Sequence, residues 1–98
     1  MKMRSCLGLT VLALFLAVPA AAVEVPYLTG RVTDNAEILD QVTRDSLAGL
    51  LRDYEVRSGS QVVVLTVPTL GSDSIEEYAE RVFNSWHLGQ QGKNNGVL

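Results

Sequence analysis

The chain has 98 residues, of which 47% are hydrophobic and 6% aromatic, with 8 basic side chains, 11 acidic side chains and a single cysteine. This length allows one small domain. The composition excludes a collagen-like chain, a low-complexity chain and a disulfide scaffold, and it is too apolar for a disordered segment.

The first 22 residues have the three parts of a secretory signal. Residues 1–5 are basic, residues 6–18 are almost entirely apolar, and small residues follow. We expect cleavage after Ala22, and cleavage after Ala20 also fits. The alternative is a retained membrane anchor, which needs about 20 apolar residues. The run reaches that length only by counting through Pro19, so the sequence predicts export to the periplasm or cell envelope.

The exported product, residues 23–98, is acidic. Removal of residues 1–22 takes away two of the eight basic side chains, which leaves six against eleven acidic ones. With no basic cluster, the charge argues against a nucleic-acid partner and against an anionic membrane surface. No dinucleotide-binding fingerprint is present either. Membrane association is therefore expected only if an anchor lies downstream.

An extended segment and a short strand are expected at the start of the exported product. Pro26 disfavours helix in residues 23–30. Residues 30–34 can form an edge strand with Val32 facing inward. Residues 35–39 are ambiguous and could form one helical turn.

The first strong element is a helix over residues 41–57. Asp40 is suited to cap its start, and Gly59 can take the left-handed conformation after its end. We expect Arg44 and Glu55 to lie outside the apolar stripe that faces the core. That stripe follows helical spacing and comprises Leu47, Leu50, Leu51 and Tyr54.

The next elements are a strand over residues 61–67 and a second helix. The strand is apolar without alternation, which is typical of a parallel strand covered on both faces. Ser74 and Glu77 form a capping-box pattern at the start of the helix, and Gly89 is expected to close it. Its apolar face comprises Ile75, Tyr78, Ala79, Val82, Phe83 and Trp86.

A further apolar run begins at Val97, after a loop rich in glycine and asparagine. A strand, a helix and a new strand in this order predict a right-handed βαβ unit. We therefore expect an α/β fold, with a small, mostly parallel sheet flanked by helices in a three-layer sandwich. Because the new strand has two residues, we interpret residues 23–98 as the N-terminal portion of a truncated domain. A complete small domain is the alternative.

No catalytic residue can be assigned from the sequence. It contains no phosphate loop, no G-x-S-x-G elbow and no H-E-x-x-H motif. The single histidine, His87, is expected on the polar side of its helix, which disfavours a hydrolytic triad and a zinc site.

Ligands for a hard cation such as Ca²⁺ are present in the loops. The metal-ligand candidates are Asp34, Asn94 and Asn95, because such ions take carboxylate and amide oxygens. Asn94 and Asn95 precede a strand, so in a parallel sheet they should lie at its amino end, away from the carboxyl ends where ligands usually bind. The alternative is that these residues only form turns and caps.

Five blocks of sequence together resemble the TPM domain family, which is found in exported bacterial proteins and in the plant thylakoid lumen. The blocks are V-T-D-N-A followed by I-L in 32–39, S-G-S-Q-V-V-V in 58–64, S-I-E-E-Y-A in 74–79, W-H-L-G in 86–89 and N-G-V-L in 95–98. Members usually continue from N-G-V-L into a long strand, and they commonly have Asp where this chain has Asn94.

The resemblance implies an α/β sandwich and export. Photosystem II repair, acid phosphatase activity and Ca²⁺ binding have been attributed to members, and bacterial members are often associated with membranes through a later segment.

Two functions follow as expectations. The first is an exported, non-catalytic module that binds a partner or a cation, Ca²⁺ being the candidate, in assembly or maintenance of a membrane protein complex. The alternative is a metal-assisted acid phosphatase with Asp34 and the 94–95 loop near the metal, although phosphoryl transfer needs positive charge that this chain does not concentrate. A nonfunctional fragment is a third possibility.

Overall fold

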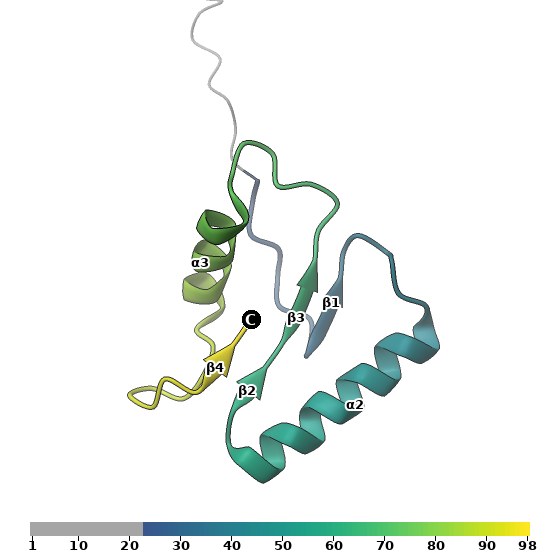
Figure 1. The fold of residues 1–98 in the computed structure, drawn as a ribbon, viewed down its shortest axis with the longest axis vertical. Helices are drawn as coiled ribbons and strands as arrows, with labels where there is room; N and C mark the ends of the chain where they lie inside the picture. Colours follow the sequence, from purple (N-terminus) through teal and green to yellow (C-terminus); the bar gives the residue numbers. More distant parts are fainter. Residues whose placement is uncertain (1–22) are drawn as a thin grey trace, which may run out of the picture.

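The structure is a computed structural model, and it describes residues 23–98. The predicted secretory signal, residues 1–22, lies outside the described residues. Figure 1 shows the strands between the two helices. The elements in chain order are β1 (Val32–Asp34), α2 (Gln41–Ser58), β2 (Gln61–Val62), β3 (Val64–Thr66), α3 (Ile75–Trp86) and β4 (Gly96–Val97).

The strands pair in parallel, and this confirms the predicted α/β class. β1 pairs with β3, and β2 pairs with β4. The backbone N–H of Val63 donates to the carbonyl of Val97 at 3.0 Å, whereas the N–H of Val64 donates to the carbonyl of Arg31 at 2.8 Å. Since successive N–H groups of a strand point to opposite edges, β4 lies beside the first half of the 61–66 segment and β1 lies beside the second half, on the other edge.

The expectation that residues 61–67 are covered on both faces is wrong in part. Only Val63 is buried, and the other six residues are half-buried. Each half of the segment pairs with a neighbour along one edge only. The predicted single strand is accordingly divided at Val63 into β2 and β3.

Helix α2 begins and ends as predicted to within one residue. The carboxylate of Asp40 accepts a hydrogen bond from the backbone N–H of Thr43 at 2.7 Å. At the other end Gly59 has a φ of 80°, and its N–H donates to the carbonyl of Glu55 at 2.8 Å. A residue with a side chain is strained in this left-handed conformation, which explains the glycine.

The inward face of α2 differs from the predicted stripe. Leu51 is buried, but the side chains of Leu50 and Tyr54 are exposed. Arg44 and Glu55, which were expected outside the core-facing stripe, are half-buried. They form ion pairs with residues of the β1 region, so the face of α2 that meets this region carries charged side chains as well as Leu51. The pairs are Arg31 with Glu55 at 3.2 Å and Arg44 with Asp34 at 3.5 Å.

Strand β1 also turns a different side chain inward. Thr33 is buried with 2% of its surface exposed, while Val32 is half-buried. The hydroxyl oxygen of Thr33 lies 3.1 Å from the hydroxyl oxygen of Thr29, which satisfies the buried polar group. Side chains alternate between the two faces of a strand. The prediction that Val32 faces inward therefore also placed Thr33 on the wrong face.

Helix α3 has the predicted capping box. The Ser74 hydroxyl accepts from the Glu77 N–H at 3.1 Å, and the Glu77 carboxylate accepts from the Ser74 N–H at 3.2 Å. Tyr78 and Val82 are buried, as the apolar face predicts. The helix ends at Trp86, earlier than expected, because His87 takes the left-handed conformation with a φ of 52°.

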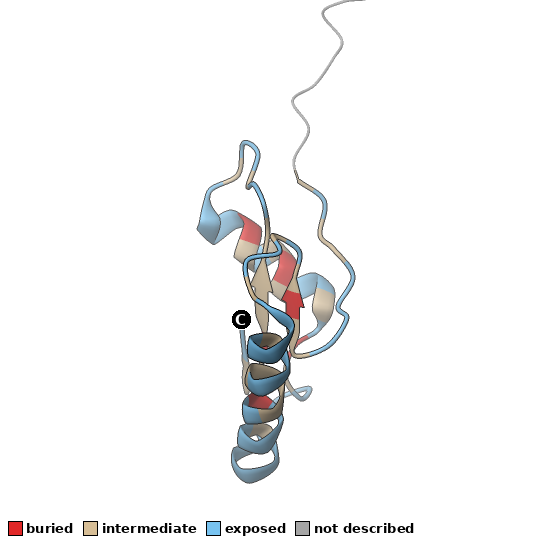
Figure 2. Ribbon diagram, turned by 90° about the vertical axis from the view of Figure 1, so that its right-hand side faces the viewer, coloured by how far each residue is buried: buried red, intermediate tan, exposed pale blue. Residues whose placement is uncertain are grey.

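The buried apolar residues form a small core between the helices and the strands. They are Leu51, Val63, Tyr78, Val82 and Leu88. Figure 2 shows the buried residues as short red segments, while most of α2 is pale blue and therefore exposed. Within residues 23–98, neither helix is long and apolar enough to cross a membrane.

Candidate functional site

The structure does not bring the three predicted metal ligands together. Asp34 ends β1 and lies opposite Thr66 in the parallel register, whereas Gly96, which follows Asn94 and Asn95, lies opposite Gln61. The segment from residue 61 to residue 66 spans about 16 Å at about 3.3 Å per residue. Asp34 is therefore at the carboxyl end of the strands, and the two asparagines are at the amino end.

At the carboxyl end of the strands, Asp34 is the side chain with the most hydrogen-bond and ion-pair partners. One carboxylate oxygen accepts from the Thr66 hydroxyl at 2.6 Å and from the Ile38 N–H at 3.2 Å, and the other accepts from the Leu39 N–H at 2.9 Å. The guanidinium of Arg44 lies 3.5 Å from the second oxygen, and 1% of the Asp34 side chain is exposed. The pKa of Asp34 is lowered from its ordinary value. The largest cause is the hydrogen bond from Thr66, and the two backbone N–H groups and Arg44 act in the same direction.

These donors make Asp34 a clamp that joins β1, β3 and α2. The Thr66 hydroxyl also accepts from the Ala36 N–H at 3.1 Å, so the turn after β1 is fixed to β3 by two residues. A cation at Asp34 would replace donors that already point at its oxygens. Sequence reasoning missed Thr66 and Arg44 as partners of Asp34, although Thr66 carries the only hydroxyl in residues 61–67.

Asn95 connects three segments at the amino end. Its side-chain oxygen accepts from the Gln90 N–H at 2.6 Å, and its side-chain nitrogen donates to the Gly59 carbonyl at 2.7 Å. Its own carbonyl accepts from the Gln61 N–H at 2.8 Å. Both ends of the Asn95 amide are thus used to hold the loop before β4 against the end of α2.

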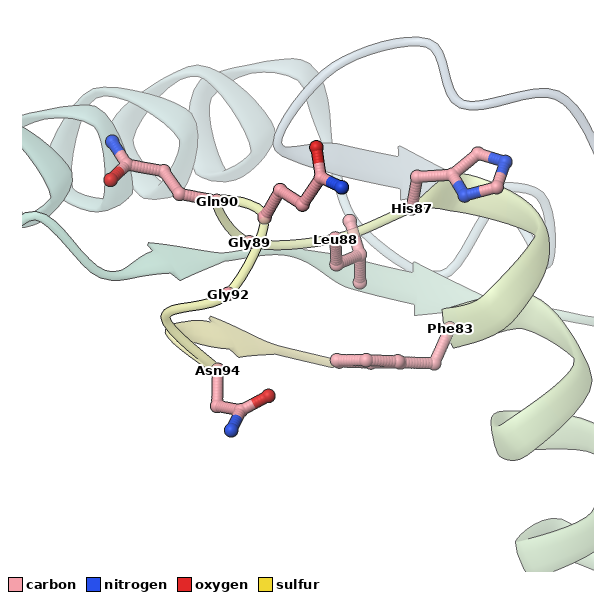
Figure 3. Close-up of a pocket in the computed structure, with 8 residues that line it drawn as sticks. Phe83, His87, Leu88, Gly89, Gln90, Gly92 and Asn94 are labelled. Carbon is pink, nitrogen blue, oxygen red and sulfur yellow. The ribbon is translucent and has the colours of Figure 1, made fainter.

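Asn94 is exposed, has a φ of 51° and lines an open pocket of about 580 Å³. Figure 3 shows the Asn94 side chain on the opposite side of this pocket from His87, with the two side chains pointing apart. A ligand site usually has a few polar groups that converge, and these two do not. Among residues 23–98, no three histidine, cysteine, aspartate or glutamate side chains gather where they could hold a metal ion.

A second pocket is apolar and lies beside β3. We call it the β3–α3 groove; its volume is about 290 Å³. Its lining residues are Val64, Leu65, Val67, Ile75, Tyr78, Ala79, Val82 and Leu98. Ile75, at its rim, is 59% exposed. The groove continues the line of β4, because β4 precedes Leu98 directly.

The positive side chains near the strand ends are engaged by carboxylates. Arg44 pairs with Asp34, Arg31 pairs with Glu55, and Arg81 pairs with Asp73 at 2.9 Å. The first turns of both helices are also occupied, by Asp40 in α2 and by the capping box in α3. A phosphate group needs free N–H donors or cations, so neither helix start is prepared for one.

Parallel strands joined through two helices define this protein as a small α/β domain. The chain belongs to the TPM domain family, because a family model named for a TPM phosphatase and described as the TPM domain matches residues 32–98. The resemblance found in the sequence blocks is thereby confirmed.

Three curated plant proteins are similar to the chain over 69 residues, or 68% of its length. Two chloroplastic UPF0603 proteins of rice, from the indica and japonica subspecies of Oryza sativa, are each 33% identical to it over 23% of their own length. A chloroplastic UPF0603 protein of Arabidopsis thaliana is 35% identical over 24% of its length. The chain thus spans about a quarter of the length of the curated relatives it matches.

Proposed function

We propose that the chain is an exported, non-catalytic module that binds an extended apolar segment of a polypeptide in the β3–α3 groove, as part of the assembly or maintenance of a membrane protein complex. The observation that carries the proposal is the groove itself, which is apolar, open and bordered by a strand. Export to the periplasm or cell envelope is part of the proposal. It is supported by the pattern of residues 1–22 and by the chloroplastic names of the plant relatives.

The backbone of β3 favours an extended partner. Val64 donates to the carbonyl of Arg31, and the Thr66 carbonyl accepts from Asn35, so these groups face β1. Because backbone groups alternate along a strand, the N–H and carbonyl of Leu65 face the opposite edge. On that edge β4 already pairs with β2. A partner strand in line with β4 would pair with Leu65 and place alternate side chains in the groove, as in strand addition.

Site-specific photo-crosslinking tests this proposal. A photoreactive residue at Ile75, on the rim of the groove, is compared with one at Val42, which is 75% exposed on α2. We expect cross-linking in the cell envelope from Ile75 and not from Val42, with a captured peptide that is apolar and extended. Sequencing that peptide distinguishes a segment of a longer form of this polypeptide from a segment of another protein. A polar captured peptide, or equal capture at both positions, contradicts the proposal.

The second candidate is a metal-assisted acid phosphatase, and the name of the matching family model favours it. Its test is phosphate release from a generic phosphomonoester with and without Ca²⁺ or Mg²⁺. If the chain is a phosphatase that uses Asp34, Asp34→Ala abolishes turnover and Asp53→Ala, on the exposed surface of α2, does not. A Ca²⁺-dependent rise in melting temperature without turnover indicates cation binding alone.

A further inference from the structure

The extended segment before β1 is held against α3 by side chains that bind its backbone. The Tyr78 hydroxyl donates to the carbonyl of Glu24 at 3.4 Å, and the Trp86 ring N–H donates to the carbonyl of Pro26 at 2.8 Å. The guanidinium of Arg81 donates to the carbonyl of Val23. The first described residues are therefore fixed in place.

Asp73 lies at the same point, in the turn before α3. One of its carboxylate oxygens, Oδ2, is buried and lies 2.9 Å from Nη2 of Arg81. Among the described residues, this oxygen accepts no hydrogen bond of good geometry. A buried carboxylate oxygen in that condition is unusual and calls for an explanation.

Arg81 links Asp73 to Val23 directly. The nitrogen that lies beside Asp73 Oδ2 is the one that donates to the Val23 carbonyl, so both oxygens contact a single atom. The backbone nitrogen of Val23 is separated from that carbonyl group by one Cα atom, so it lies within about 4 Å of the carbonyl oxygen that Arg81 binds.

We propose that Asp73 is the binding site for the chain's own processed N-terminus, with the ammonium group of Val23 paired to Asp73 Oδ2. This rests on the predicted removal of residues 1–22. Hydrolysis of the peptide bond between Ala22 and Val23 adds water across it. The carboxylate leaves with the leader, and the amine stays on Val23 and takes up a proton. The amide N–H thereby becomes a positively charged ammonium group with three N–H donors. Such a group can form a charge-assisted hydrogen bond to the buried Oδ2 of Asp73.

The surrounding charges favour an ammonium group. The acidic side chains in this region are those of Asp73, Glu24 and Glu77, the Tyr78 hydroxyl lies beside them, and Arg81 is the basic group that opposes an ammonium group. The pKa of Arg81 is raised, chiefly by its close contact with the Asp73 carboxylate. An α-amino group ordinarily has a pKa of about 7.7 to 8.0. Pairing with Asp73 raises the pKa of the Val23 amine, so its contribution to stability is present below the ordinary value and is lost as pH rises through the raised one.

The test measures the titration of the Val23 amine by NMR, in the processed protein secreted from the full-length precursor. Mass spectrometry confirms that the product begins at Val23. We expect the α-amino pKa to lie about one unit above its ordinary range. Asp73→Asn should return it to that range, and Asp53→Asn, a matched change at a 65% exposed side chain, should leave it raised.

A second variant does not depend on changing Asp73. Two glycines inserted between Ala22 and Val23 leave the Asp73–Arg81 pair intact but move the ammonium group two residues away, so the pKa should again be ordinary. An ordinary α-amino pKa in the protein that begins at Val23 overturns the proposal, as does a raised pKa that persists with the insertion. Neither result bears on the β3–α3 groove, so failure here is distinguishable from failure of the proposed function.

Discussion

At Asp34, hydrogen bonds from a turn and a strand and an ion pair from a helix converge on one carboxylate. The Thr66 hydroxyl, two backbone N–H groups and Arg44 together favour its ionised form, and its pKa is lowered. A group whose pKa is lowered by folding contributes stability above its unfolded pKa, and that contribution is lost as pH falls through the folded pKa. The pKa of Asp40 is also lowered, chiefly by its hydrogen bonds with Thr43, so Asp40 adds to the same dependence of stability on pH.

We predict that Asp34→Asn lowers stability at pH 7 and weakens the loss of stability below about pH 4. The reason is that the amide cannot accept all of the carboxylate's hydrogen bonds and does not titrate. Urea denaturation, repeated at intervals of about one pH unit from about pH 3 to about pH 7, measures how the free energy of unfolding depends on pH. Asp53→Asn should retain the pH dependence of the unmodified protein, and an unchanged dependence in Asp34→Asn would contradict the clamp.

Asp34 could be singled out from the sequence, but sequence reasoning missed its role and its partners Thr66 and Arg44. The sequence indicates Asp34 as a candidate oxygen ligand for a cation, but the partners of its carboxylate are residues 38, 39, 44 and 66. Only Thr66 could have been inferred, since the parallel register places it opposite Asp34. Asn95 has a side chain that serves the loop before β4, and a sequence pattern cannot distinguish such an amide from a metal ligand.

At the scale of elements, the starts of both helices and the end of α2 were predicted more accurately than the inward face of α2. Caps depend on local hydrogen bonds, such as those of Ser74 and Asp40, which sequence spacing encodes directly. The orientation of α2 depends on distant residues, because Arg44 and Glu55 pair with the β1 region. Those pairs could not be derived from the apolar stripe, which by itself places Leu50 inward.

We predict that Ser74→Ala destabilises the protein by about 1 kcal/mol, because the start of α3 loses its N-cap. Chemical denaturation measures the difference. Ser85→Ala is the matched control, since Ser85 is exposed within α3 and alanine is the better helix former there. An equal loss in both variants would show that the capping box contributes nothing.

At the scale of the molecule, a close backbone contact holds β4 in place. A Cβ atom on Gly96 would lie 2.6 Å from the carbonyl carbon of Leu88 and 2.7 Å from the nitrogen of Gly89. Two of the sequence blocks that identify the family, in residues 86–89 and 95–98, therefore contact each other directly. Their association explains why both contain glycine.

We predict that Gly96→Ala destabilises the protein by about 1 to 3 kcal/mol, because backbone atoms must move apart. Gly49→Ala makes the same change within α2, where no atom lies within 4 Å of the added Cβ, and should stabilise by about 1 kcal/mol. Thermal unfolding of both variants measures the two shifts. Shifts of the same sign would contradict this account.

The parallel strands and α/β class followed from the order of apolar and helical segments, whereas the division of the central strand did not. Residues 61–67 are almost entirely aliphatic and do not alternate between apolar and polar side chains, so the sequence shows no sign of a division. The division at Val63 arises from where β1 and β4 lie along it, which depends on the loops that place those strands.

Because of the division at Val63, two consecutive backbone N–H groups bond to strands on opposite edges of the 61–66 segment. The N–H of Val63 is bonded to the β4 edge, and the N–H of the next residue, Val64, is bonded to the β1 edge. Hydrogen–deuterium exchange at these two consecutive amides therefore reports on opposite sides of the protein. Detachment of one outer strand can be followed at one amide while its sequence neighbour stays protected.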